Sequence, residues 1–182
     1  MATTKWQLDP AHSNVEFAVK HLMIATVRGR FAAVNGTLEV DDKNPKNAKV
    51  DVTIETGSID TRQEQRDAHL RSSDFFDADR FPTMHFVSKR VDGDPRGEFK
   101  VVGDLTIRDV TRELTLNVTA EGLGKDPWGG YRAGFSATGK IDRREYGLTW
   151  NQTLETGGIV VGDEIKLTVD AEFVQQAAQA AA

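Results

Sequence analysis

The first part of this sequence contains the side chains of a hydrolytic site, namely histidine, carboxylates and a serine. The most suggestive group is Asp9, His12 and Ser13, because serine, histidine and aspartate form the triads of many hydrolases. We predict that His12 and Ser13 lie in one extended segment. Adjacent side chains there point to opposite faces, so the histidine cannot readily activate the serine. The Gly-x-Ser-x-Gly turn of α/β-hydrolases is absent as well, and we expect no catalytic residues.

The same histidines raise the question of a metal site. The four are His12, His21, His69 and His85, and no two of them have the His-x-x-x-His spacing of a helical metal motif. Asp67 and His69 are two residues apart, which directs their side chains away from each other on a helix. Cysteine is absent, which excludes disulfides and thiolate ligands. We predict no metal ion and no resident cofactor.

The composition is that of an ordinary globular chain. It has 182 residues, 38% of them apolar, and a net charge of −5. We predict one domain over residues 1–182, with a core at about 6–174 and a frayed tail at 175–182. Charges of both signs are mixed without a basic stripe, so nucleic acid is not an expected partner.

Two further observations concern location. No run approaches the ~18 apolar residues of a transmembrane helix. The first residues, from Met1 to Trp6, lack the apolar stretch of a secretory signal. We therefore predict a cytoplasmic protein.

The elements that would position any site are strands, because most of the chain alternates apolar and polar residues. The clearest alternation is near the end of the chain, from Ile165 to Phe173. Strands are expected over residues 15–19, 31–40, 50–54, 84–86, 99–107, 114–118, 133–141 and 165–173. Gly36 suggests a bulge or a bend in the second of them. About eight strands with short loops predict an all-β protein, an eight-stranded antiparallel barrel of the lipocalin type.

A short helical insert at about residues 60–80 interrupts this alternation. Thr61 and Glu64 have the spacing of a capping box, which predicts a helix over residues 61–70. Ser73 is expected to cap a second short turn that carries Phe75 and Phe76. We expect the insert to gate or close one end of the barrel.

Polar and aromatic residues of the insert are candidates for a lid or for contact with a ligand's head group. They are Arg66, Asp67, His69, Phe75 and Phe76. An ion pair between Arg66 and Asp67 that only fastens the insert is an equally good reading.

Apolar residues on the expected inner faces predict a lumen that suits an acyl or prenyl chain. The candidates are Val15, Phe17, Val19, Phe31, Phe86, Phe99, Val101, Leu105, Phe135, Leu148 and Trp150. Ordinary core packing is the alternative for each of them. Small inward residues either leave a cavity or let the sheet bend; they are Gly29, Ala33, Gly103, Ala133 and Gly139.

Ordered short motifs across residues 6–174 resemble the YceI-like family. They include Leu8-Asp9-Pro10-Ala11-His12-Ser13, Val19-Lys20-His21-Leu22, Ser58-Ile59-Asp60-Thr61, Arg66-Asp67-Ala68-His69-Leu70-Arg71-Ser72, Gly103-Asp104-Leu105-Thr106-Ile107 and Trp128-Gly129-Gly130. The resemblance implies a lipocalin-like barrel whose lumen binds a polyprenyl lipid, an isoprenoid quinone or a fatty-acid derivative. Many family members resemble secreted, periplasmic proteins, and this sequence departs from them in its first residues.

The sequence thus predicts noncovalent binding of a long isoprenoid or acyl lipid for storage or transport, without enzyme activity. Two alternatives remain. One is a stress-response interaction domain whose barrel is filled by its own side chains, and the other is a lipid-modifying enzyme. Exposed aromatic residues and edge strands would also permit a homodimer.

Overall fold

Strands dominate the computed structural model, which describes residues 3–155 and 158–177. Within those residues the strands are β1 (Thr3–Leu8), β2 (Asn14–His21), β3 (Ala25–Phe31), β4 (Val34–Asp41), β5 (Lys49–Glu55), β6 (Ile59–Asp60), β7 (Thr83–Gly93), β8 (Glu98–Ile107), β9 (Val110–Lys125), β10 (Tyr131–Asp142) and β11 (Glu164–Gln175). The helices are α1 (Glu64–Arg71) and the 3-10 turns η1 (Pro10–His12), η2 (Pro45–Asn47), η3 (Thr56–Ser58) and η4 (Arg143–Tyr146). No helix in this part of the chain is long and apolar enough to cross a membrane.

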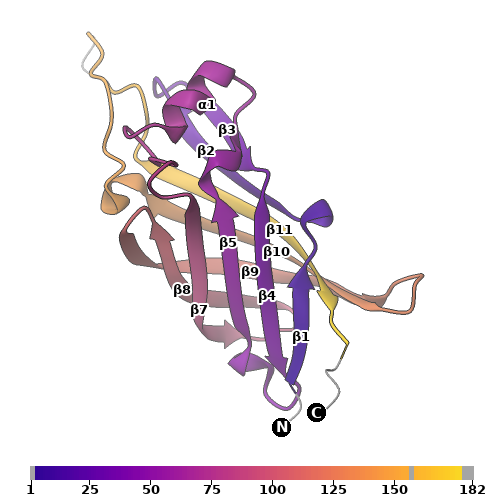
Figure 1. Ribbon diagram of the computed structural model, residues 1–182. Coiled ribbons are helices and arrows are strands. Elements are labelled where there is room, and N and C mark those ends of the chain that lie inside the picture. Colours follow the sequence, from indigo (N-terminus) through magenta and orange to yellow (C-terminus); the bar gives the residue numbers. More distant parts are fainter. Residues whose placement is uncertain (1–2, 156–157, 178–182) are drawn as a thin grey trace.

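Eight of the strands close into an antiparallel barrel (Figure 1). The order is β1-β4-β5-β7-β8-β9-β10-β11, and β11 pairs with β1 to complete the ring. Closure removes free sheet edges from the wall. Alternate residues of every strand therefore face a common interior.

One edge of β11 is shared by two strands. The end of β11, from Phe173 to Gln175, pairs with β1. Its middle, from Lys166 to Asp170, pairs with β2. η1 fills the gap between them, and β3 and β6 continue the sheet beyond β2. β1 and β2 thus act as one wall strand with an interruption.

The predicted eight-stranded antiparallel barrel with one short helix is confirmed, although some of its strands differ from the expectation. The single strand predicted over 31–40 is two strands, β3 and β4, which separate after Phe31. β1 was not predicted, and of the bulge or bend expected at Gly36 the bulge is absent. Gly36 stays in regular register with Val52, and a Cβ there would lie 2.9 Å from the carbonyl oxygen of Asp51.

The predicted capping box is also wrong. The helix begins at Glu64, and the side chain of Gln63 accepts the amide N–H of Arg66. The hydroxyl of Thr61 is instead turned toward the carboxylate of Asp67. In the turn that follows, the amide of Asp74 donates to the hydroxyl of Ser72, not of Ser73 as expected.

The predicted frayed tail at 175–182 overlaps the structure only at its start. Gln175 is the last residue of β11. Residues 178–182 lie outside the described part of the chain.

Two glycines of the sheet lie under aromatic rings. A Cβ on Gly29 would be 2.4 Å from Cζ of Phe17, its direct partner across the strands. A Cβ on Gly103 would be 2.6 Å from Cζ of Phe86 and 2.5 Å from the carbonyl oxygen of Val87. The space beside each of these glycines is therefore filled by a neighbouring aromatic ring, a role that differs from the predicted cavity and from the predicted bend.

We therefore expect Gly103→Ala to lower the free energy of unfolding by about 1–3 kcal/mol, the usual cost of overpacking. The displaced atoms would include backbone, which cannot move away cheaply. Gly57→Ala is the matched control, because no atom lies within 4 Å of a Cβ there. Urea unfolding of both variants checks the prediction, and equal stabilities would contradict it.

Candidate ligand-binding cavity

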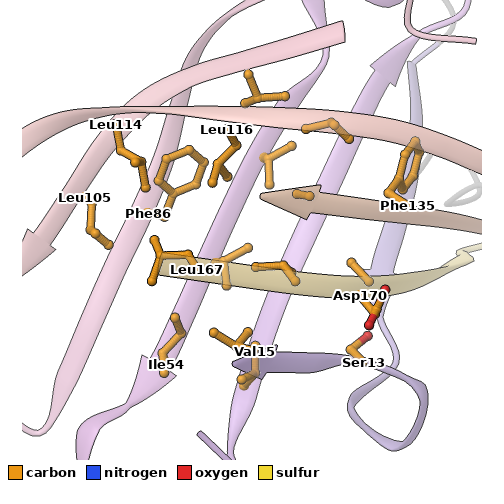
Figure 2. A pocket seen from close by; sticks show the side chains of 18 of the residues that line it. Ser13, Val15, Ile54, Phe86, Leu105, Leu114, Leu116, Phe135, Leu167 and Asp170 are labelled. Atoms are coloured by element: carbon orange, nitrogen blue, oxygen red, sulfur yellow. The ribbon is translucent and has the colours of Figure 1, made fainter. Parts of the chain in front are cut away.

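The barrel encloses a cavity of about 550 Å³ (Figure 2). Its lining is almost wholly apolar and comes from the inner faces of the wall strands. On β11, for example, Leu167 and Val169 face inward while Thr168, between them, faces solvent. Alternation along a strand explains this division. Pockets of 300–1,000 Å³ are typical of sites for small molecules.

Ten of the eleven residues predicted to face the lumen line this cavity. They are Val15, Phe17, Val19, Phe31, Phe86, Phe99, Val101, Leu105, Phe135 and Leu148. Trp150 does not line it. Its ring packs against the insert, 4.6 Å from the ring centre of His69 and 5.4 Å from that of Phe75.

Much of the lining was missing from the predicted set. Trp6 and Leu8 come from β1, the strand that was not predicted. Others lie on predicted strands and could have been included by extending the alternation, as with Val34, Leu38, Ile54, Met84, Leu114, Leu116, Ala137, Leu167 and Phe173.

The α1 insert covers one end of the barrel (Figure 1). Leu70, Phe75 and Phe76 line that end of the cavity. Phe75 is buried, and the ring centres of Phe76 and Phe31 are 5.7 Å apart. The predicted lid aromatics therefore do face the lumen.

Thr61 fastens the insert to the barrel. Its amide and hydroxyl both donate to the buried carboxylate of Asp67, with an N–O distance of 2.9 Å for the amide. The guanidinium of Arg66 donates to the hydroxyl and carbonyl oxygens of Thr61, both at 2.7 Å. The predicted ion pair between Arg66 and Asp67 is replaced by this shared attachment. Neither side chain lines the cavity.

His69 also faces away from the cavity. Its Nε2 lies 2.9 Å from a carboxylate oxygen of Asp74, and its ring stacks edge-on against Trp150. Arg66, Asp67 and His69 thus hold the insert in place. No contact with the lumen connects them to a ligand's head group.

Buried Arg143 organises the chain behind this end, although nothing in the sequence singled it out. Its guanidinium donates to the carbonyl oxygens of Leu148, Trp150 and Gly162 at 2.6, 2.8 and 2.8 Å. A cationic side chain can stay buried when backbone oxygens satisfy its donors. Because arginine side chains are mostly exposed, a buried structural role for Arg143 was not predicted.

The opposite end of the cavity is less covered. Among the described lining residues, four are exposed: Arg96, Gly122, Leu123 and Asp170. The first three lie near the β7–β8 turn and the far end of β9. Leu123 is 69% exposed although it belongs to the lining. The cavity is therefore closed at α1 and accessible at the other end.

Ser13 and Asp170 bring oxygen atoms to one side of the cavity, where β1 gives way to β2 (Figure 2). The hydroxyl of Ser13 accepts the amide of Glu172 at 3.1 Å and lies 3.5 Å from the carbonyl oxygen of the same residue. Ser13 thereby forms hydrogen bonds with the stretch of β11 that pairs with neither β1 nor β2. His12 lies in η1, so the expected extended segment is wrong there, and its ring contacts Asp9 rather than Ser13.

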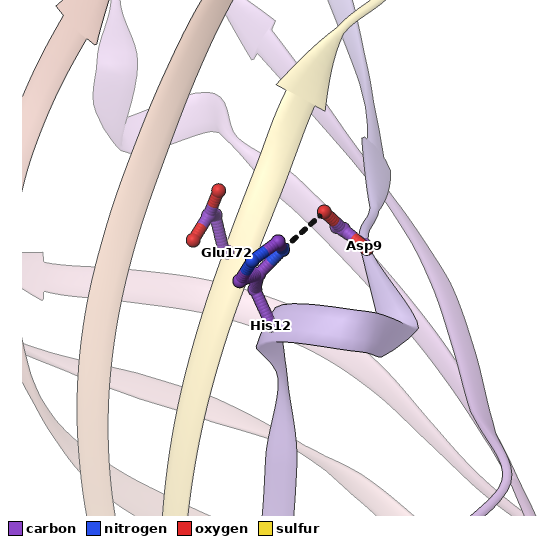
Figure 3. Close-up of side chains that lie close together, drawn as sticks. All are labelled: Asp9, His12 and Glu172. Carbon is purple, nitrogen blue, oxygen red and sulfur yellow. Dashed lines mark hydrogen bonds and ion pairs between the residues drawn. The ribbon is translucent and has the colours of Figure 1, made fainter. Parts of the chain in front are cut away.

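Asp9, His12 and Glu172 bring metal-ligand atoms within 4.8 Å of one another (Figure 3). An arginine already binds the two carboxylates. Nη1 of Arg132 lies 2.8 Å from Asp9 and 2.7 Å from Glu172, and its Nε lies 3.2 Å from Asp126. The cluster thus joins η1, β10 and β11 across the strand interruption.

Asp9 and His12 shift each other's pKa values. The hydrogen bond from His12 and then that from Arg132 lower the pKa of Asp9 from 3.8 to about 2. Asp9 in turn raises the pKa of His12 above 6.5. Protonated His12 and ionised Asp9 are therefore the paired forms.

An eight-stranded closed barrel with an apolar cavity places this chain among the lipocalin-like barrels, which hold small ligands inside. Residues 6–173 match the YceI-like domain, and the chain belongs to that family.

Its relatives extend over nearly the whole chain. A UPF0312 protein of Staphylococcus aureus is 43% identical over 171 residues, which cover 93% of this chain and 97% of the relative. The crystal structure of a Campylobacter jejuni YceI protein is 32% identical, with a TM-score of 0.74, and covers 87% of this chain and 90% of that one. A polyisoprenoid binding domain from Saccharophagus degradans shares the fold at 13% identity, with a TM-score of 0.68 over 92% and 97% of the two chains.

The ion pair between Asp9 and His12 predicts a pH-dependent stability. The contribution of His12, whose pKa is raised, is complete below 6.5 and is lost as the pH rises through its raised pKa. The contribution of Asp9, whose pKa is lowered, is present above 3.8 and is lost as the pH falls through about 2.

We therefore expect His12→Gln to reduce the urea midpoint at about pH 5.5 and to change it little at about pH 9. The same substitution made in an Asp9→Asn background should lose this pH dependence. A pH-independent effect of His12→Gln in both backgrounds would contradict the assignment.

Because Thr61 attaches the insert, we expect the insert to stay closed over this end of the barrel. The amides of Phe76 and Ala78 donate to carbonyl oxygens of α1, and we expect slow hydrogen exchange at both in the empty protein. Asp67→Ala removes the acceptor of two buried donors. Because that costs about 1–3 kcal/mol, exchange at these amides should rise about fivefold or more.

Glu64→Ala is the control for this exchange measurement. Its side chain is on the same helix but almost fully exposed. Similar exchange rates in the Asp67→Ala and Glu64→Ala variants would show that the attachment does not hold the insert closed.

Proposed function

We propose that this protein binds one long isoprenoid or acyl chain noncovalently in its barrel, for storage or transport. The observation that carries the proposal is the cavity of about 550 Å³ with its continuous apolar lining. A buried CH₂ group contributes about 0.8 kcal/mol, so a long chain gains affinity without polar contacts. The family and the barrel shared with a polyisoprenoid binding domain support the same class of ligand.

The cavity also supports this proposal over a filled barrel. A barrel packed by its own side chains would leave no room of this size, because protein interiors are close-packed. The rings of Phe17 and Phe86 lie against the wall over Gly29 and Gly103 and so leave the centre of the barrel open.

The polar groups of the cavity do not favour catalysis. In the described part of the chain they belong to Ser13, Arg96, Arg143 and Asp170. The hydroxyl of Ser13 is bound to the backbone of Glu172, and Arg143 is bound to backbone carbonyl oxygens. A nucleophile needs a base for activation, and in the described residues the hydroxyl of Ser13 forms hydrogen bonds only with the backbone of Glu172.

The insert is proposed to close the barrel permanently rather than to gate it. Asp67 and Thr61 are buried and hydrogen-bonded, which makes opening costly. A chain bound in the cavity would then place its apolar end under Phe75 and Phe76. Its polar end would face the less covered end, near Arg96.

Filling the lumen tests the proposal. Ala137 lies on β10, is buried and lines the cavity. We expect Ala137→Trp to weaken binding of a fluorescent prenyl alcohol or fatty acid, since the indole takes space from the ligand. Losing room for two CH₂ groups costs about 1.6 kcal/mol, or about fifteenfold in Kd.

Thr138→Trp is the matched control, because Thr138 is adjacent on the same strand and faces solvent. Titration of both variants with the two probes gives the comparison and identifies the preferred chain. Equal affinities of the Ala137→Trp and Thr138→Trp variants would place the ligand outside the barrel and contradict the proposal.

A further inference from the structure

The β9–β10 hairpin extends beyond the barrel wall (Figure 1). β8 pairs with β9 no further than Thr119, whereas β9 continues to Lys125. Beyond that point β9 pairs only with β10. The extension carries three of the most exposed large apolar residues of the described chain: Leu123 at 69%, Trp128 at 82% and Tyr131 at 47%.

A bulge determines which face of the hairpin is apolar. Phe135 pairs with Ala120 while Gly134 pairs with Gly122, so Glu121 is the extra residue. After the bulge, Leu123 lies opposite Ala133, which lines the cavity. Tyr131, two residues before Ala133, faces the same side. The hairpin therefore continues the cavity's inner surface outward past the rim.

The loop at the tip holds Trp128 in an exposed position. Asp126 accepts the amides of Trp128 and Gly130 at 3.0 and 2.8 Å, and Gly129 has a φ of +89°. The guanidinium of Arg132 lies 5.9 Å from the indole centre. An exposed indole on an ordered loop is suited to contact another surface.

Charges at this end suit a surface that carries phosphate groups. Lys125 lies opposite Tyr131 on the apolar face, and Arg96 lines the same end of the cavity. Neither side chain forms an ion pair within the described residues. The carboxylate of Asp126 is turned inward to the loop amides and to Arg132. The hairpin thus combines Leu123, Trp128 and Tyr131 with Lys125, and aromatic, apolar and cationic residues favour a bilayer interface. Arg96 lies in the neighbouring β7–β8 turn, where Asp94 and Glu98 are also exposed.

We propose that this hairpin docks on a phospholipid bilayer and guides the lipid between the bilayer and the open end of the barrel. The inference rests on the proposed function for its cargo, while docking can be measured without cargo. Leu123 and Tyr131 would lie in the interfacial layer beside Trp128. Lys125 and Arg96 would face lipid phosphates.

Vesicles of phosphatidylcholine and phosphatidylglycerol test the docking directly. Of the three tryptophans, Trp128 is exposed, whereas Trp6 is buried and Trp150 half-buried. We expect the fluorescence of Trp128 to shift to the blue and to be quenched by brominated lipids. The Leu123→Ser, Trp128→Ser double variant should co-float with vesicles about tenfold less than the unaltered protein.

The control carries Met23→Ser and Ile24→Ser. These residues are 59% and 84% exposed in the β2–β3 turn, at the opposite end of β11 from the hairpin. The control should float like the unaltered protein. Circular dichroism and the thermal midpoint establish that both variants fold, as expected for exposed positions.

Equal flotation of both double variants, or no flotation of the unaltered protein, would overturn the docking site. A dimer detected by light scattering and lost only in the hairpin variant, without vesicle binding, would assign the surface to a second copy and also overturn it. The two proposals fail separately. If the unaltered protein binds the fluorescent prenyl alcohol normally, and it and the hairpin variant transfer the alcohol between vesicles at the same rate, only the guiding role is rejected. Flotation without any cargo binding rejects only the proposed function.

Discussion

The pairing along one edge of β11 is the constraint on which the barrel and its cavity depend. β1 takes the end of that edge and β2 takes its middle, so two short strands complete one wall. The interruption between them leaves backbone groups that need partners. Ser13 supplies a hydroxyl to Glu172, and Arg132 joins Asp9 and Glu172 across the gap. The amide of Asp9 also donates to the carbonyl oxygen of Glu172, so backbone and side chains together join the interruption to β11.

Closure of the ring turns alternating strands into a container with two unlike ends. The α1 end is fastened through Thr61 and Asp67, which are buried and share hydrogen bonds. At the other end Leu123 belongs to the cavity lining yet remains mostly exposed. An apolar chain would gain the most by placing its tail at the closed end, where every CH₂ group leaves water. The direction of binding that we propose follows from this difference between the ends.

Local alternation allowed the barrel and most of the chosen lumen residues to be predicted, because a residue's face in a strand follows from its position. Pairing between distant segments could not be read in the same way. β1 was missed because a short strand with Trp6 and Leu8 gives little alternation. Phe31 was assigned to the same strand as β4 because the residues on both sides of the β3–β4 connection are apolar. Arg66 and Asp67 have the charges of an ion pair, but their common partner, Thr61, is determined by tertiary contacts. The polar residues that attach the insert could therefore be identified only from the structure.

Mass spectrometry of the protein as purified tests the central claim, that the barrel holds a lipid chain. The protein would be measured once under native conditions and once after extraction with organic solvent. We expect a stoichiometric adduct under native conditions that is released by extraction and identified as a prenyl or acyl lipid. A bare mass under native conditions, with no thermal shift on adding prenyl lipids, quinones or fatty acids, would contradict the account.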